Sequence, residues 1–124
     1  MFAPSPFGIM LKQAREDARL SQLDLSMELG KTAQYISNIE KGKNNSPPDD
    51  ADLQILIAKL GLSAPEAEHF RFLAYADRGM LPPEMFNYVF NSPSLISLIR
   101  NAAEHGIDDE FWNKTLKNMN RKGI

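Results

Sequence analysis

Residues 22–41 read QLDLSMELGKTAQYISNIEK, a pattern that predicts two short amphipathic helices joined at Gly30. Leu25 and Leu29 lie one turn apart on the same face of the first helix, and the small side chain of Ser26 lets another helix cross closely. Gly30 is suited to the left-handed backbone conformation that ends a helix without steric cost. The chain is therefore expected to turn sharply at this glycine.

The predicted second helix has one apolar and one polar face. Thr32 is a natural N-cap, and Ile36 and Ile39 are expected to face inward. The polar face, expected to point outward, contains Gln34, Ser37, Asn38 and Lys41. Glutamine and asparagine amides each match the two hydrogen-bonding groups of an adenine edge, and a helix that exposes them suits the major groove. The pattern therefore predicts a helix that reads base pairs in double-stranded DNA.

These motifs resemble the Xre-type helix-turn-helix regulators, a family that includes phage repressors and Cro-like proteins. The resemblance covers about residues 7–62 and rests on Leu-Ser-Gln at 20–22, Leu-Gly at 29–30, Tyr-Ile-Ser at 35–37 and Ile-Glu-Lys-Gly at 39–42. It implies an all-α fold with a five-helix lambda-repressor-like DNA-binding domain. It also implies a transcription regulator, a repressor that binds an inverted-repeat operator as a homodimer.

The resemblance assigns roles to individual residues. It implies base reading by Ala33, Gln34, Ser37 and Asn38, with Ala33 near a thymine methyl where some phage members carry a base-reading glutamine. It implies phosphate or positioning contacts by Gln22, Thr32, Tyr35, Lys41, Lys43 and Asn44, with Gln22 also bracing Gln34. Arg15 and Glu40 occupy positions where family members form a largely buried ion pair between the first and third helices.

Further helices are predicted on either side of this pair. Ser5 and Pro6 open a helix that extends to about Arg19, and a fourth helix follows the turn-forming segment 42–48 and ends at Gly61. Ser63 and Glu66 form a capping box that opens a fifth helix extending to about Arg78. Residues 1–79 are therefore expected to form the DNA-binding domain.

Residues 80–124 are predicted to form a helical C-terminal segment for oligomerisation or regulation. Short helices are expected after Pro83, after Ser92-Pro93 and after Asp108. The segment has many large apolar side chains but too little chain to bury them alone, so another chain is expected to cover them. The expected dimer contacts are Leu95, Ile99, Phe111, Trp112 and Leu116.

Three alternatives remain for this segment. The first is an antitoxin whose tail covers a toxin. The second is a stress or phage-type repressor whose tail is cut by a regulatory metallopeptidase, and the third is a pure protein-interaction module. The motifs Leu-Pro-Pro-Glu at 81–84, Ser-Pro-Ser-Leu at 92–95 and Asp-Asp-Glu-Phe-Trp at 108–112 look similar to tails of cleavable regulators. Co-purification of a small basic protein would indicate an antitoxin, and cleavage in trans between residues 80 and 124 would indicate a cleavable repressor. A lack of any DNA affinity would indicate a protein-interaction module.

Composition narrows the functional classes. The 124 residues contain no cysteine, so a disulfide framework and a thiolate zinc site are excluded, and no apolar run approaches the roughly 20 residues of a membrane span. We expect a cytoplasmic protein without membrane association. His69 and His105 lie far apart in the sequence with no cysteine and no clustered ligand pattern, and the chain has no nucleophile motif, glycine-rich phosphate loop or HExxH pattern. We therefore expect no enzyme, metal or cofactor.

The formal net charge of −2 conceals a gradient along the chain. Residues 1–46 have a net charge of +1, whereas residues 47–124 have a net charge of −3. Three lysines lie within residues 31–46, where Glu40 is the one acidic residue. The positive charge is therefore expected beside the reading helix, where phosphate contacts are needed.

Overall fold

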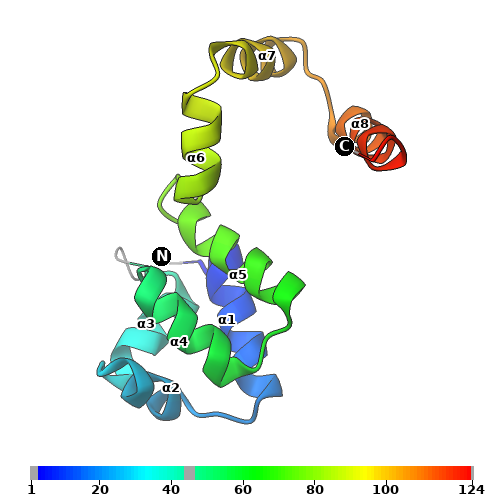
Figure 1. Cartoon of the computed structure of the whole chain (residues 1–124). Helices are drawn as coiled ribbons and strands as arrows, with labels where there is room; N and C mark the ends of the chain where they lie inside the picture. Colours follow the sequence, from blue (N-terminus) through cyan, green and yellow to red (C-terminus); the bar gives the residue numbers. More distant parts are fainter. Residues whose placement is uncertain (1–2, 44–46, 124) are drawn as a thin grey trace. The chain divides into compact units, whose positions relative to one another are not determined.

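The computed structural model describes residues 3–43 and 47–123 and shows helices but no strand in those ranges, which confirms the all-α fold class (Figure 1). The chain divides into two compact units, Met1–Pro83 and Glu84–Ile124. The boundary expected between residues 79 and 80 stays a prediction, and each unit is described below by itself.

Within the described residues, five helices form the first unit and three more follow it. The first five are α1 (Pro6–Asp17), α2 (Gln22–Leu29), α3 (Ala33–Lys41), α4 (Asp50–Leu60) and α5 (Ala64–Ala76). The others are α6 (Pro83–Phe90), which starts at the boundary, α7 (Pro93–Glu104) and α8 (Asp109–Arg121). None of the helices in the described ranges combines the length and apolar character that crossing a membrane requires.

Local capping interactions set most helix starts as predicted. The Ser5 hydroxyl accepts a hydrogen bond from the Gly8 amide at 3.0 Å, with Pro6 at the first helical position. Ser63 and Glu66 form the predicted reciprocal capping box at α5. These starts were predictable because the interacting groups are only three residues apart.

Three details differ from the predictions. α1 ends at Asp17 rather than near Arg19, because Arg19 has a left-handed φ of 58° that ends the helix. α5 ends at Ala76 rather than near Arg78. Thr32 lies at the N-cap of α3, but its hydroxyl makes no capping bond. The Tyr35 amide donates to the Thr32 carbonyl oxygen at 3.0 Å.

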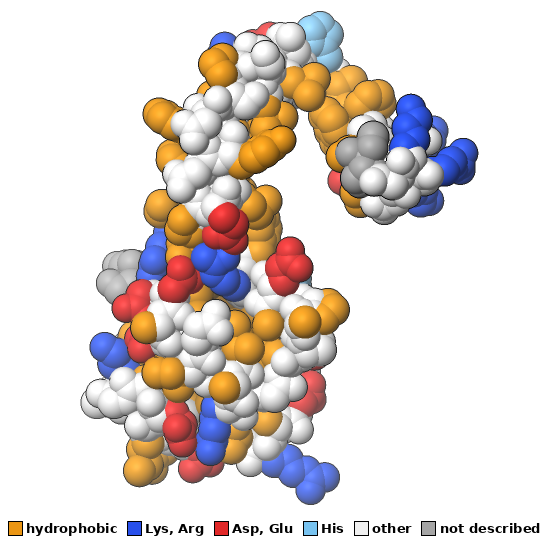
Figure 2. Space-filling view, in the orientation of Figure 1, with side chains coloured by type: hydrophobic (Ala, Val, Ile, Leu, Met, Phe, Trp, Pro, Cys, Tyr) orange, Lys and Arg blue, Asp and Glu red, His pale blue; other side chains and the backbone are white. Residues whose placement is uncertain are grey.

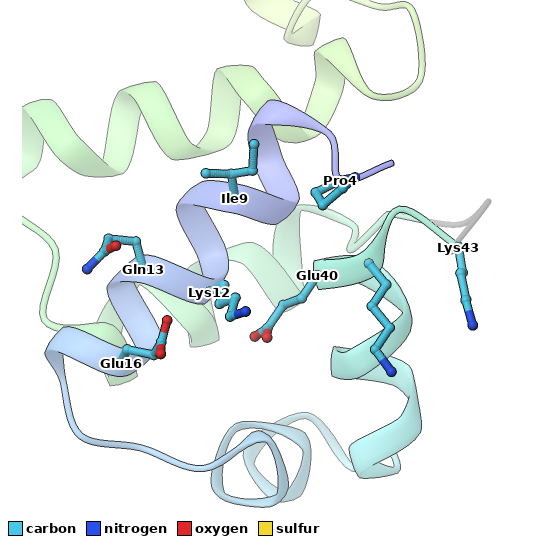
Figure 3. Close-up of a pocket in the computed structure, with 8 residues that line it drawn as sticks. Pro4, Ile9, Lys12, Gln13, Glu16, Glu40 and Lys43 are labelled. Carbon is cyan, nitrogen blue, oxygen red and sulfur yellow. The ribbon is translucent and has the colours of Figure 1, made fainter. Parts of the chain in front are cut away.

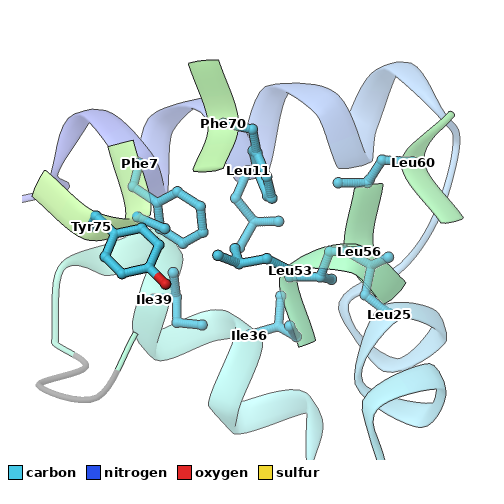
Figure 4. Close-up of a cluster of buried hydrophobic side chains, with 11 residues drawn as sticks. Phe7, Leu11, Leu25, Ile36, Ile39, Leu53, Leu56, Leu60, Phe70 and Tyr75 are labelled. Atoms are coloured by element: carbon cyan, nitrogen blue, oxygen red, sulfur yellow. The ribbon is translucent and has the colours of Figure 1, made fainter. Parts of the chain in front are cut away.

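The hydrophobic core of the first unit is built from all five of its helices. Its buried members are Phe7, Leu11, Leu25, Ile36, Ile39, Leu53, Leu56, Leu60, Phe70, Ala74 and Tyr75 (Figure 4). The rings of Phe7 and Phe70 lie 4.8 Å apart and connect α1 to α5. Because Ile36 and Ile39 anchor α3 in this core, the opposite face of α3 has a defined orientation toward solvent.

One glycine allows α1 and α3 to pack closely. A Cβ atom at Gly8 would lie 2.5 Å from the carbonyl oxygen of Ile39, closer than a side chain tolerates. The absence of a side chain at this position therefore lets the two helices approach. This contact links the first helix directly to the predicted reading helix.

The second unit differs because none of its described residues is buried. Phe86 and Phe90 stack with their ring centres 5.8 Å apart, and Phe111 and Trp112 make an edge-to-face contact at 5.0 Å. Hydrophobic side chains nevertheless remain at the surface of these helices (Figure 2). The second unit therefore has local ring contacts but no enclosed core among its described residues.

Candidate nucleic-acid interface

The turn between α2 and α3 has the geometry predicted from Gly30. This residue has a φ of 66°, and its amide and that of Lys31 donate to the carbonyl oxygens of Met27 and Ser26. Ser26 is fully buried and its hydroxyl donates to the Leu23 carbonyl oxygen at 2.8 Å. A small, internally bonded residue at this position lets α2 and α3 pack together in a helix-turn-helix.

Arg15 of α1 and Glu40 of α3 face each other across the helix crossing. Arg15 donates from Nε to Glu40 Oε2 at 2.8 Å and from Nη2 to Oε1 at 3.0 Å, and its Nη1 donates to the Leu20 carbonyl oxygen at 2.9 Å. The two side chains are only 13% and 3% exposed. Hydrogen bonding to Glu40 raises the pKa of Arg15. The guanidinium therefore joins α1, the α1–α2 turn and α3.

Gln22 belongs to the same network. Its Nε2 donates to Glu40 Oε1 at 3.1 Å. The resemblance implied that Gln22 braces Gln34, and this was wrong: in the described structure the Gln22 amide bonds to Glu40, whereas Gln34 bonds to Asn38. The reason is that Glu40 lies buried beside the start of α2 and needs donors for both of its oxygens.

The outer face of α3 presents a coupled pair of amides. Gln34 Nε2 donates to Asn38 Oδ1 at 2.7 Å, one turn along the helix. Gln34 is exposed, while Ala33 and Asn38 are half-buried. Each amide keeps further donor and acceptor capacity beyond this bond. Two polar groups suited to base edges are thus held together on a rigid helix.

Ser37 does not lie on this outer face. It is only 8% exposed, which corrects the expectation of an outward-pointing, base-reading serine. Both α1 and α2 pack against α3, so its buried surface extends past Ile36 to include Ser37 and Glu40. The spacing of Ile36 and Ile39 in the sequence predicted only the centre of that buried surface.

The residues expected at phosphates surround the two ends of α3. Thr32, Lys41 and Lys43 are exposed, and Lys31 Nζ lies 5.6 Å from the centre of the half-buried Tyr35 ring. Burial raises the pKa of the Tyr35 hydroxyl. The expected contact at Asn44 lies outside the described residues.

A cluster that was not predicted connects α5 to the segment after α3. Arg71 donates to both carboxylate oxygens of Asp50, at 3.0 and 3.2 Å, and Arg78 donates to the carbonyl oxygens of Pro47 and Pro48. Both guanidiniums lie over the Tyr75 ring, at 5.2 and 5.8 Å. Arg71 and Tyr75 lie one turn apart on one face of α5, and Arg78 follows in the turn after the helix. The partners of the two arginines lie more than 20 residues away in the sequence, so no local sequence pattern could predict these contacts.

The five residues expected at a dimer contact all lie in the second unit. Ile99, Phe111 and Leu116 are about half exposed, and Leu95 and Trp112 are partly buried. An apolar groove of about 210 Å³ lies between α7 and α8 and is lined by Leu98, Asn101, Ala102, His105, Ile107, Phe111 and Trp112. The structure therefore leaves an apolar surface on this unit.

Comparison with known proteins agrees with the geometry of the first unit. The family model described as Helix-turn-helix matches residues 11–66, which include α2, the Gly30 turn and α3. Searches of curated proteins and of solved structures found no match to the chain. The glycine turn, the polar outer face of α3 and this family match lead to one conclusion. Residues 11–66 form an Xre-like helix-turn-helix domain, which supports a DNA-binding transcription regulator.

Proposed function

We propose that the protein is a repressor that binds an inverted-repeat operator in double-stranded DNA as a homodimer. The observation that carries the proposal is the hydrogen-bonded amide pair of Gln34 and Asn38 on the outer face of α3. The buried Arg15–Glu40 pair and the core residue Ile36 hold this face in place from behind. An operator occupied in this way would block access of polymerase to a promoter.

The amide pair favours adenine reading by Gln34. One N–H of its amide is used by Asn38, and the remaining N–H and Oε1 match N7 and the N6 amino group of adenine. The Asn38 amino group remains available as a donor to an acceptor on a neighbouring base, such as guanine O6 or thymine O4. Ala33 at the start of α3 suits contact with a thymine methyl. Buried Ser37 is not proposed as a base-reading residue.

Phosphate contacts would orient α3 in the groove. We assign this role to Thr32, Tyr35, Lys41 and Lys43, which lie within or next to the two end turns of α3. Gln22, at the first position of α2, would offer one amide proton to a phosphate while the other remains on Glu40. Such contacts position the protein but do not select sequence, so specificity is expected to depend on Gln34 and Asn38.

The second unit supports a homodimer because of the apolar area that it leaves uncovered. In the described range 84–123, ten large apolar side chains are between 41% and 74% exposed: Met85, Phe86, Tyr88, Phe90, Leu98, Ile99, Ile107, Phe111, Leu116 and Met119. At roughly 100 Å² each, they expose on the order of 1,000 Å² per chain, compared with about 800 Å² per partner in a standard interface. We propose that a second copy of this unit covers this area.

In vitro selection from a random pool of duplex DNA with the full-length chain tests the proposal. We expect enrichment of two half-sites in inverted orientation, with centres about 34 Å or a multiple of one helical turn apart. Asn38→Ala protein should select a pool with relaxed preference at one position of each half-site. Enrichment of single half-sites would contradict the dimer, and a pool without any enriched sequence would contradict sequence-specific binding.

A further inference from the structure

A cleft of about 600 Å³ lies between α1 and the C-terminal end of α3 (Figure 3). Pro4, Ile9, Lys12, Gln13, Glu16, Glu40, Lys41 and Lys43 line it. Lys12 comes from α1, whereas Lys41 and Lys43 come from the end of α3 and the residues that follow. The cleft therefore extends the lysine-rich end of the reading helix onto a second helix.

The charges around this cleft do not cancel. The Glu40 carboxylate is already bound by Arg15 and Gln22 and is only 5% exposed, so its charge is compensated within the fold. Glu16 is then the one remaining acidic residue of the lining, which also contains Lys12, Lys41 and Lys43. A net positive charge next to a DNA-reading helix favours an anion on the DNA backbone.

The walls of the cleft are held by close backbone packing. Gly8 brings α1 against the backbone of α3 at Ile39, as described above. At the other end, a Cβ at Gly42 would overlap the carbonyl oxygen of Ala3, so Ala3 lies directly against the C-cap of α3. The lysines of α1 and α3 therefore belong to one rigid surface.

We infer that this cleft binds a phosphate of the DNA backbone and that Lys12 is a positioning residue for operator binding. The inference rests on the proposed function and extends its contact surface from α3 to α1. DNA is favoured over a free anion because Lys41 and Lys43 continue the same positive surface to the reading helix. Exposed ammonium groups without buried backbone donors hold an isolated anion weakly, whereas a duplex engages several of them at once.

The salt dependence of operator binding by the full-length chain tests the role of Lys12. Lys12→Ala removes one phosphate contact from each subunit of the dimer and is expected to reduce the slope of log affinity against log salt by about 1.8, or about 0.9 per contact. Its loss of affinity relative to wild type should then be about 12-fold larger at 50 mM than at 200 mM salt. The half-site preference should stay unchanged, because a phosphate contact does not select bases. Lys12 is exposed, so the variant should fold normally.

Two further variants control the experiment. Glu16→Gln removes the acidic group of the cleft and should tighten binding at low salt. Lys59→Ala removes a lysine of α4 that does not line the cleft and lies 3.4 Å from Glu28, so its slope should equal that of wild type. A wild-type slope for Lys12→Ala would overturn the inference, as would the same reduced slope for Lys12→Ala and Lys59→Ala.

A parallel measurement separates this inference from the proposed function. Asn38→Ala should lower preference at its base while keeping the wild-type salt slope. If Asn38→Ala changes neither preference nor affinity, the reading role of α3 fails, and the cleft inference fails with it. If Asn38→Ala behaves as proposed but Lys12→Ala keeps the wild-type slope, only the cleft inference fails.

Discussion

Replacement of Arg15 should destabilise the first unit more than replacement of Glu40. Arg15→Met removes two of the three donors to Glu40 and its one cation, leaving a carboxylate with a 3% exposed side chain and only the Gln22 amide. The expected cost is about 5 kcal/mol, the upper end for breaking a buried ion pair. Glu40→Met leaves a guanidinium that is 13% exposed and still bonded to the Leu20 carbonyl, so about 3 kcal/mol is expected.

The double variant decides whether the pair acts as a unit. Arg15→Met/Glu40→Met removes both charges and keeps apolar volume at the crossing of α1 and α3, so no charge remains buried. We expect the double variant to lose less unfolding free energy than the sum of the two single losses, by more than about 3 kcal/mol. Lys12→Met, which removes an exposed cation from the same helix, is a matched control with little expected effect.

Hydrogen exchange of the α3 amides in the full-length chain is a suitable assay. The single tryptophan, Trp112, lies in the second unit, so its fluorescence does not report unfolding of the first. Exchange protection in Ile36–Glu40 gives the local opening free energy directly. A double variant whose loss equals the sum of the single losses would refute the reasoning, because independent surface charges behave additively.

Three further predictions concern readout, assembly and pH. Gln34→Ala and Asn38→Ala should each cost about 1–3 kcal/mol of binding free energy on the cognate site. Because the two amides are hydrogen-bonded, a binding assay should show that the double variant loses less than the sum of the single losses. Additive losses would contradict a coupled pair. Deletion of residues 84–124 should leave a folded, largely monomeric chain in light scattering. A truncated chain that stays dimeric at micromolar concentration would instead place the dimer interface in the first unit, and a toxin or a peptidase would then be the expected partner of the second unit. The hydrogen bond from Arg71 lowers the pKa of Asp50, so the stability from this pair should be present above the usual aspartate pKa and fall as pH drops through the lowered value. Asp50→Asn should remove that part of the acid dependence in urea titrations, and an unchanged pH profile would show that the pair contributes nothing.

The sequence by itself determined the features that depend on neighbours within one helical turn. Ser5 and Ser63 bond to amides three residues ahead, and Gly30 adopts the left-handed conformation that its position after Leu29 predicted. The alternation of apolar and polar residues likewise placed Ile36 inside and Gln34 outside. Such features are readable because the interacting groups are close along the chain and a few side-chain types satisfy them.

Only the tertiary structure decided features that depend on which helices meet. Ser37 is buried because both α1 and α2 cover α3, and helix periodicity contains no information about the number of neighbours. Gln22 bonds to Glu40, 18 residues away, because the buried carboxylate lies beside the start of α2. The cleft likewise gathers Lys12 and Lys41 from separate helices. Packing of apolar faces brings these polar groups together, and no local pairing rule encodes which ones meet.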